Sequence, residues 1–188
     1  ADNTIYDLSW VEDFTAEAFP PTDWGRYRGL YPTEPLEANT SRWERGDFAY
    51  IADPANPAAR CRIWGTSTKH WLVTPPISIP AGTHQLEFDL ALTAWGSSDP
   101  ITPGDQADDR FIVLIAENPT MIGATVLREW NNTGSPYVYD DIATLSEPQA
   151  ISLGGHTGVR FIGFYGESTE SGGDGALFVD NVKVTELP

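Results

Sequence analysis

Near the C-terminus, the segment ALFVDNVKV places one carboxylate in a strand-like run of otherwise mostly apolar residues. Because successive side chains of a strand alternate between its two faces, the pattern predicts that Phe178, Asp180, Val182 and Val184 share one face. A carboxylate on a core-facing position must be hydrogen-bonded, paired or metal-bound, since an isolated buried charge is very unfavourable. Asp180 is therefore the first candidate for a site.

Further acidic residues are candidates to join Asp180 around a cation. Glu12 and Asp13 lie in the first strand-like run, and Asp109 comes just before the run RFIVLIA. Carboxylates combined with backbone carbonyls suit calcium, whereas thiolate and imidazole ligands for zinc are scarce, with 1 Cys and 3 His. The alternative is that Asp180 only accepts backbone N–H groups of a neighbouring turn, and the spacing favours neither interpretation.

Sequence motifs for catalysis are missing: the chain contains no HExxH, no GxSxG and no glycine-rich phosphate loop. Glu87 and Asp89 share a face in LEFDLAL, as the paired carboxylates of a β-sandwich glycosidase would. The next position on that face is Ala91, which interrupts the three-carboxylate pattern of such hydrolases. We therefore expect a protein that is not an enzyme.

Strands are the elements that must position these side chains. Apolar runs recur between turn signals, and in HQLEFDLALTAW the residues Leu86, Phe88, Leu90 and Leu92 fall on one predicted face. Aromatic residues make up 12% of the chain, alongside 17 Gly and 15 Pro, and no stretch has a convincing helical pattern. The sequence predicts an all-β fold, an antiparallel β-sandwich of jelly-roll type, as one domain over residues 1–188, with an irregular stretch from about residue 25 to 62.

The charge of the chain restricts the classes of partner that it can bind. A net charge of −16 disfavours nucleic acid and anionic membrane surfaces, because both require basic patches. No apolar run reaches the roughly 18 residues of a membrane-spanning helix. Cys61 is the single cysteine, so no internal disulfide is expected.

Four motifs in order carry a family resemblance: VEDFTAEAFPPTDW, WLVTPPISIPAGTHQLEFDLAL, GVRFIGFYGES and ALFVDNVKV. Together they resemble the bacterial cleaved-adhesin domain and the related choice-of-anchor J domains, and more distantly MAM domains. The resemblance implies a jelly-roll sandwich with structural calcium, found on secreted or surface-anchored bacterial proteins and therefore extracellular or at the cell surface. It implies ligands at Glu12 or Asp13 and at Asp180, with Asp109 and Asp89 as further possible ligands.

Jelly-roll accessory domains commonly bind glycans through exposed aromatic rings, which offer apolar area at little cost in entropy. Trp95 and Trp130 are the candidate platforms, widened by Tyr137 and Tyr139, while polar groups for sugar hydroxyls come from a further set: Arg128, Asn131, Asn132 and Asp99. Packing roles for Trp95 and Trp130 are the alternative, and Trp24 and Trp71 are assigned to the core.

Two functions follow from these features. The first is a calcium-stabilised, non-catalytic module that binds polysaccharide or another glycan. The second is a protein-binding adhesion or spacer domain without a small ligand.

Overall fold

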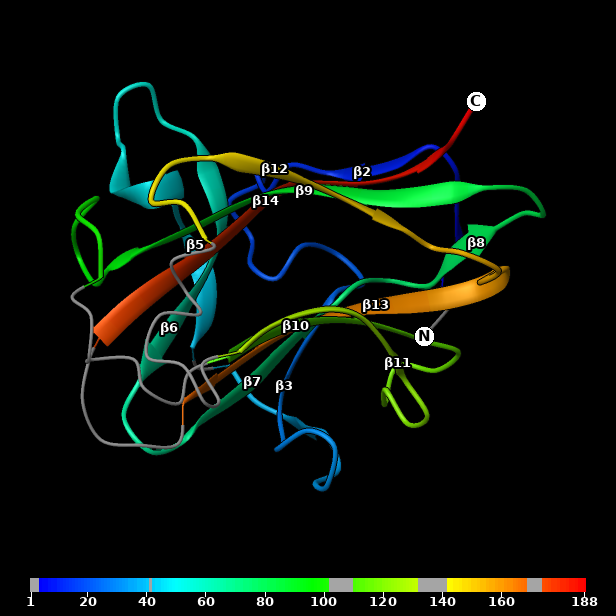
Figure 1. The fold of residues 1–188 in the computed structure, drawn as a ribbon, viewed down its shortest axis with the longest axis horizontal. Helices are drawn as coiled ribbons and strands as arrows, with labels where there is room; N and C mark the ends of the chain where they lie inside the picture. Colours follow the sequence, from blue (N-terminus) through cyan, green and yellow to red (C-terminus); the bar gives the residue numbers. More distant parts are fainter. Residues whose placement is uncertain (1–3, 41, 102–109, 132–141, 169–173) are drawn as a thin grey trace.

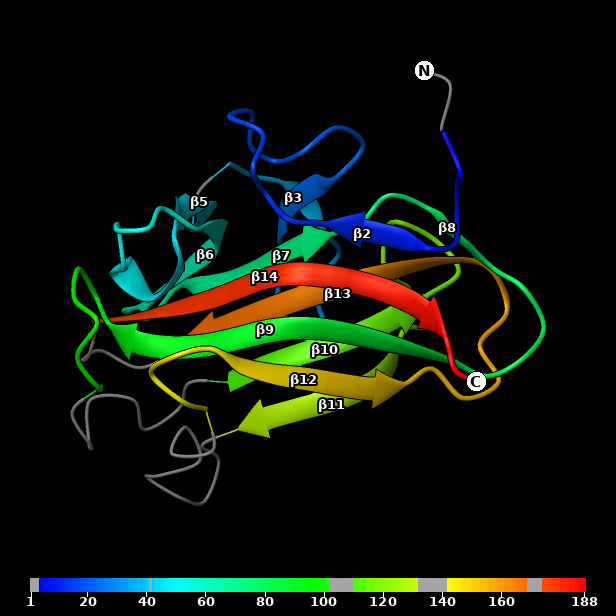
Figure 2. The same cartoon turned by 90° about the horizontal axis from the view of Figure 1, so that it is seen from above.

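Two long strands near the end of the chain organise the computed structural model. β13 (Gly158–Ser168) and β14 (Asp174–Glu186) are the central strands of two sheets that pack face to face (Figures 1 and 2). The structure describes residues 4–40, 42–101, 110–131, 142–168 and 174–188. Each central strand has one long neighbour on one side and two shorter strands in succession on the other.

The first sheet is built around β13. Its members besides β13 are β1 (Tyr6–Asp7), β3 (Gly25–Arg28), β4 (Glu37–Ala38), β7 (Thr68–Val73), β8 (Ile77–Ile79), β10 (Arg110–Ala116) and β11 (Thr125–Asn131). β10 is the long neighbour of β13, and β7 and β8 follow one another along its other edge. All described pairs of this sheet are antiparallel except β1 with β8, which is parallel.

The second sheet is built in the same way around β14. Its other members are β2 (Trp10–Glu12), β5 (Trp43–Asp47), β6 (Pro57–Trp64), β9 (His84–Ala94) and β12 (Glu147–Ser152). β9 is the long neighbour of β14, and β6 and β2 follow one another along its other edge. A short 3₁₀ turn, η1 (Phe48–Tyr50), packs on this sheet.

The predicted fold class is confirmed: 54% of the described residues lie in strands and 2% in helix, and the two sheets are not closed into a barrel. The prediction of an irregular stretch from about residue 25 to 62 is wrong, because this part of the chain contains β3, β4, β5 and most of β6. β3, β4 and β5 are short and rich in polar residues, so their sequences lack the clear apolar alternation seen in β9, and in β6 the alternation is carried by arginines rather than by a continuous apolar set.

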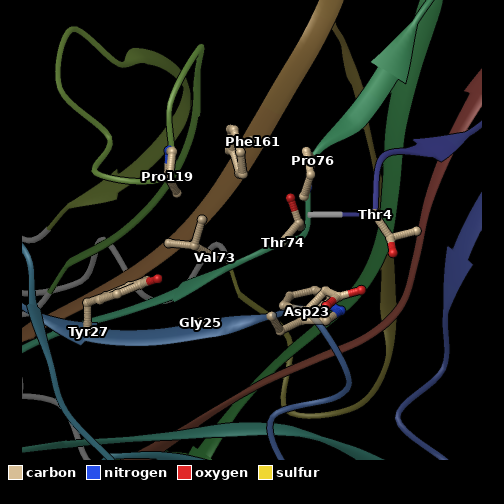
Figure 3. A pocket seen from close by; sticks show the side chains of 10 residues that line it. Thr4, Asp23, Gly25, Tyr27, Val73, Thr74, Pro76, Pro119 and Phe161 are labelled. Atoms are coloured by element: carbon tan, nitrogen blue, oxygen red, sulfur yellow. The ribbon is translucent and has the colours of Figure 1, made fainter. Parts of the chain in front are cut away.

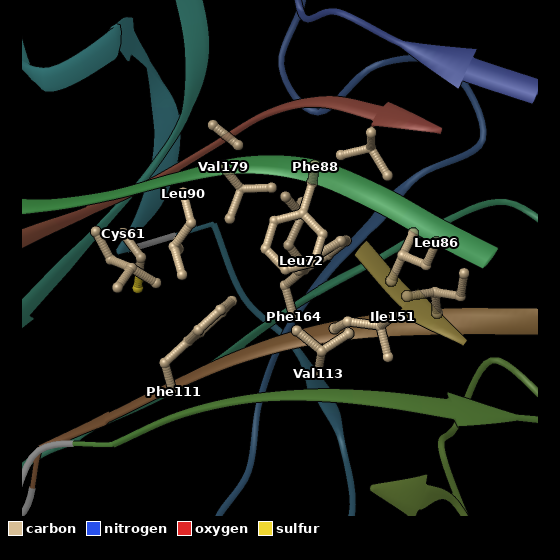
Figure 4. Packing of buried hydrophobic residues seen from close by; sticks show 14 of the residues in the cluster. Cys61, Leu72, Leu86, Phe88, Leu90, Phe111, Val113, Ile151, Phe164 and Val179 are labelled. Atoms are coloured by element: carbon tan, nitrogen blue, oxygen red, sulfur yellow. The ribbon is translucent and has the colours of Figure 1, made fainter. Parts of the chain in front are cut away.

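The core lies between the two sheets, as the alternation in β9 predicted. Leu86, Phe88 and Leu90 are at most 2% exposed and point from β9 toward the other sheet (Figure 4). The ring of Phe88 packs edge-on against Phe164 of β13, with ring centroids 5.5 Å apart. Trp43 adds a hydrogen bond between the two sheets, because its indole N–H donates to the backbone carbonyl of His70 in the other sheet at 3.1 Å.

A β-bulge divides β14 and reverses its alternation. Its register with β9 shifts between Asp180 and Lys183, and Asn181 has a φ of 48°. Before the bulge Val179 belongs to the central core and Phe178 to a cluster on the outer face, whereas after it Val182 belongs to the core. The prediction that these four residues share one face is therefore wrong. The extra residue of the bulge shifts the alternation by one position, so that even-numbered instead of odd-numbered residues face the core after it.

The inter-sheet contact of Phe88 gives a stability prediction. We expect Phe88→Ala to lower the free energy of unfolding by about 3–5 kcal/mol, the usual cost of truncating a buried Phe. Val11→Ala, at a side chain 53% exposed, should change it by no more than about 0.5 kcal/mol. Urea unfolding of both variants is the measurement, and similar losses in the two would contradict the described packing.

Candidate functional site

Asp180 lies at the bulge, where the edge partner of β14 changes. The pairing with β6 ends at Val179 and the pairing with β2 begins at Val182, so Asp180 and Asn181 fall between the two short strands. The Asp180 side chain is only 1% exposed. In register it stands opposite Asp89 of β9, which places two carboxylates side by side on one face of the sheet.

Hydrogen bonds at the bulge satisfy part of this acidic pair. Asp180 Oδ1 accepts the backbone N–H of Asn181 at 2.8 Å, and the Asn181 side-chain amide donates to Asp89 Oδ2 at 2.8 Å. Asp180 Oδ2 is buried and has no hydrogen-bond partner among the described residues. One oxygen of Asp180 thus makes the backbone bond that the sequence left as an alternative, while Oδ2 makes no hydrogen bond of normal geometry to the described residues, although the Asn56 side chain lies near the carboxylate.

Burial is the main cause of an unusual pKa at Asp180, which it raises to about 7. The nearby charges of Asp89 and Asp13 raise the pKa further, while the N–H of Asn181 and the side chain of Asn56 oppose the rise. These contributions show that carboxylates from β9 and from the turn after β2 lie within electrostatic reach of Asp180.

Glu12 and Asp13 hold the turn that follows β2. Glu12 Oε1 accepts the backbone N–H of Phe14 at 2.7 Å, and Asp13 Oδ1 accepts the N–H and the hydroxyl of Thr15 at 3.1 and 2.8 Å. Burial raises the pKa of Glu12, whereas the two bonds from Thr15 lower the pKa of Asp13. Both carboxylates already have local donors.

The predicted metal ligands are therefore only partly brought together. Within the described ranges, no three His, Cys, Asp or Glu side chains form a group able to hold a metal ion. Asp109 lies outside the described residues. The chemistry at the bulge still suits a hard cation, because its donors are carboxylate oxygens and one of them, Asp180 Oδ2, is buried without a partner.

The two candidate platform tryptophans have different surroundings. Trp130 is 7% exposed and stacks on Phe111 in the core at 5.2 Å, so it has the packing role that was the alternative. Trp95 directly follows β9 and is half-buried on the outer face of the second sheet, beside Tyr50. Trp24 and Trp71 are buried, which confirms their assignment to packing.

The remaining predicted ligand contacts do not gather around Trp95. Arg128 lies over the ring of Trp130 at 5.6 Å and donates to Gln149 at 2.9 Å. Asp99, after β9, accepts a hydrogen bond from Ser97 at 2.7 Å. Three further candidates, Asn132, Tyr137 and Tyr139, lie outside the described residues, as does the side chain of Asn131.

A set of arginines and aromatics beside Trp95 was missed by the sequence analysis. The guanidinium of Arg62 lies 4.6 Å from the ring centre of Trp95 and 4.9 Å from that of Trp64, and Arg42 lies 5.3 Å from Trp64. Arg60 lies 4.9 Å from Trp95. The period-two spacing of Arg60, Arg62 and Trp64 in PAARCRIW is the signal that would have placed them on one face.

This group borders an open hollow of about 480 Å³ on the outer face of the second sheet. Its lining residues are Thr40, Arg42, Glu44, Arg62 and Trp95. The small Ala176 of β14, which pairs with Arg62 on one side and Thr93 on the other, leaves room for the Trp95 ring to reach the arginines. We call Arg42, Arg60, Arg62, Trp64 and Trp95 the arginine–tryptophan face.

A second hollow, of about 240 Å³, lies against the first sheet (Figure 3). Asp23, Tyr27 and Thr74 give it polar groups, and Val73 and Phe161 give it apolar area. Asp23 is held there by the hydroxyl of Tyr6, which donates to its Oδ2 at 2.7 Å.

Solved structures with the same fold were found by comparison. The K1 cleaved adhesin domain of Lys-gingipain from Porphyromonas gingivalis W83 is 15% identical with a TM-score of 0.58, over 96% of this chain and 99% of that one. The K3 domain of the same protein is 15% identical with a TM-score of 0.55, over 95% and 98%. TmCBM61, solved with β-1,4-galactotriose, is 13% identical with a TM-score of 0.53, over 93% and 94%.

These likenesses establish the fold, and they confirm the resemblance to cleaved adhesin domains that the motifs indicated. No protein-family model matches the sequence, and no curated protein sequence matches it at the threshold applied. Across the described ranges, no helix has the length and apolar character needed to cross a membrane.

Asp180 gives a pH prediction for the metal-free protein. Its pKa is about 7 in the folded state and 3.8 ordinarily, so the folded state retains a proton that the unfolded chain has already lost between these values. The free energy of unfolding should therefore fall with rising pH across this window, and Asp180→Asn should abolish that fall. Relative to wild type, Asp180→Asn should be more stable at about pH 8 than at about pH 4 in urea unfolding.

Asp7→Asn serves as the control for this prediction, because Asp7 is exposed in β1. Its stability relative to wild type should be similar at the two pH values. If Asp180→Asn behaves like this control, the carboxylate of Asp180 does not have the unfavourable burial described above.

Proposed function

We propose that this chain is a non-catalytic carbohydrate-binding module of a secreted or surface protein, acting outside the cell. The observation that carries the proposal is the hollow on the outer face of the second sheet, which half-buried Trp95 lines and whose Arg62 also lies over Trp64, a residue that is 45% exposed. Indole rings supply flat apolar area for the C–H face of a sugar, and the arginines beside them supply donors for its hydroxyls.

The comparisons support this proposal through the fold. TmCBM61 was solved in complex with β-1,4-galactotriose, so a sandwich of this type can hold a sugar chain. The hollow of Figure 3 also has an aromatic ring, that of Tyr27, and a carboxylate, that of Asp23, in its lining.

The alternative is a protein-binding adhesion or spacer domain, which the likeness to cleaved adhesin domains supports. A protein-binding surface usually has an apolar centre of several hundred Å². The large exposed apolar side chains among the described residues are Ile5, Val11, Ile51, Trp64, Ile122, Val126, Leu145 and Val159. The hollow beside Trp95, which combines an aromatic ring with arginine donors, favours carbohydrate over protein as the partner.

Affinity electrophoresis in gels containing plant and marine polysaccharides tests the proposed function. We expect at least one polysaccharide to retard the wild type and Trp95→Ala to weaken that binding about tenfold, because the stacking ring is lost. Ile122→Ala, at a side chain 73% exposed in the connection between β10 and β11 of the other sheet, should bind like wild type. Loss of retardation in Tyr27→Ala instead would move the site to the hollow of Figure 3, and retardation by no polysaccharide would favour the protein-binding alternative.

We also propose that calcium stabilises the fold at the bulge of β14. Support comes from the opposed carboxylates of Asp180 and Asp89, from the buried Asp180 Oδ2, which makes no hydrogen bond of normal geometry to the described residues, and from the raised pKa of Asp180. A divalent cation would neutralise these carboxylates and attract their oxygens. Asp180 and Asp89 are the residues of this chain that would hold it, with Asp13 nearby.

Thermal melting in calcium and in chelator tests this second proposal. An ion present at 100 times its dissociation constant should stabilise the wild type by about 2.7 kcal/mol. Asp180→Asn should melt at the same temperature in both buffers, while Asp7→Asn should keep the wild-type difference. If the wild type melts identically in calcium and chelator, no calcium ion stabilises this fold.

A further inference from the structure

The arginine–tryptophan face concentrates positive charge on a strongly acidic protein. The chain has 11 Lys and Arg against 27 Asp and Glu, yet Arg42, Arg60 and Arg62 all stack on the tryptophans of this one face. Glu44 is the acidic residue that lines the hollow. It pairs with Arg60, whose Nη2 lies 2.7 Å from Glu44 Oε1.

Stacking on indole rings holds the arginines in a form suited to binding anions. A guanidinium uses its flat face in a cation–π contact, and its N–H donors lie in its plane and point away from the ring. Arg62 lies over both Trp64 and Trp95, and Arg42 lies over Trp64. The rings therefore orient the two guanidiniums, and this ordering lowers the entropy that the side chains lose when a ligand binds.

Arg42 is the cation of this face with the fewest protein partners. Among the described residues it makes no ion pair, and the contact described for its guanidinium is the ring of Trp64. Arg60 has a different role, because Glu44 offsets its charge and its guanidinium lies 5.1 Å from the ring centre of Tyr50 and 4.9 Å from that of Trp95. Arg60 supports the aromatic rings, and Arg42 and Arg62 border the hollow.

We infer that the ligand of this face is an anionic polysaccharide, whose carboxylate or sulfate groups are bound by the edges of Arg42 and Arg62 while sugar rings contact Trp64 and Trp95. This inference rests on the proposed carbohydrate-binding function and specifies the class of glycan. Arginine binds planar carboxylates and sulfates with two parallel hydrogen bonds, which a neutral sugar hydroxyl does not match.

The net charge of −16 does not prevent such binding. At physiological ionic strength, charges on the surface interact over a Debye length of about 8 Å, so distant carboxylates are screened from a ligand on this face. A ligand group within hydrogen-bond reach of Arg42 and Arg62 experiences mainly the local positive charge. The acidic remainder of the surface instead restricts where a polyanion can bind, which favours this face over others.

The test compares matched polysaccharides at fixed salt and calcium by affinity electrophoresis: polygalacturonate and alginate as carboxylated chains, carrageenan as a sulfated chain, and galactan and xylan as neutral ones. We expect an acidic polysaccharide to retard the wild type more than the neutral ones do. Arg42→Gln and Arg62→Gln should each weaken that binding about tenfold or more, as expected for a lost charge-assisted hydrogen bond. Arg42→Lys should lie between Arg42→Gln and wild type, because lysine keeps the charge without the planar fork.

Arg28→Gln is the matched control, since Arg28 is exposed at the end of β3 in the other sheet. It should bind acidic polysaccharide like wild type. Melting temperatures within the range of this control show that the glutamine variants remain folded. If Arg42→Gln does not fold, Arg62→Gln and Arg42→Lys still test the face.

The outcomes separate this inference from the function on which it rests. Retardation by neutral but not acidic polysaccharides overturns the inference and leaves the carbohydrate-binding function standing, whereas no retardation by any polysaccharide overturns both. Acidic binding that survives Arg42→Gln and Arg62→Gln in folded protein also overturns the inference. Polyglutamate that competes as well as the acidic polysaccharide would show an anion surface without preference for sugar, and would overturn it too. The carboxylated and sulfated arms identify which anion is bound.

Discussion

The second sheet depends on one strand, β14, pairing with segments from three distant parts of the chain. β9 borders it along most of its length, and its other edge is shared by β6 and then β2. In a regular strand without a bulge, every second residue faces the core, and this alternation continues unchanged from one end to the other. The bulge at Asp180 and Asn181 releases this constraint, so that Leu177 and Val179 before it and Val182 and Val184 after it all reach the core.

The same bulge accounts for the buried carboxylate. Residues at a bulge leave the regular ladder of hydrogen bonds, and here this occurs where β6 ends and β2 begins. Asp180 and the Asn181 amide supply polar groups to a place that the ladder does not satisfy. As a result, the carboxylate of Asp180 is buried next to the carboxylate of Asp89 and has a strongly raised pKa. A bound cation is one physical means of stabilising the two charged groups.

The two outer faces of the sandwich are covered in different ways. On the first sheet, Trp71 and Tyr165 form the centre of a second apolar cluster that includes Met121 from the loop after β10. On the second sheet, η1 covers Phe178, and beyond it the face carries arginines and tryptophans with a hollow between them. Binding is proposed on the second sheet because its side chains combine aromatic area with oriented donors, a combination suited to sugars that carry charge.

The sequence by itself determined the fold class and much of the core. The alternation of Leu86, Phe88 and Leu90 in β9 is local, and strand geometry converts it directly into one buried face. The order of the motifs likewise indicated the fold shared with cleaved adhesin domains, and it assigned Trp24 and Trp71 to packing. The alternation is predictable because it depends on residues close together in the chain, and the resemblance is predictable because each of its motifs is a short continuous segment.

Only the tertiary structure decided which side chains meet across strands. One extra residue at Asn181 reversed the parity of β14, although an Asp-Asn pair carries no sequence pattern that requires a bulge. Alternation also does not show which strand faces are covered, so Trp130 packs in the core while Trp95 lies at the surface. The arginine–tryptophan face brings together residues from positions 42 to 95, because strands distant in sequence become neighbours only when the sheet forms.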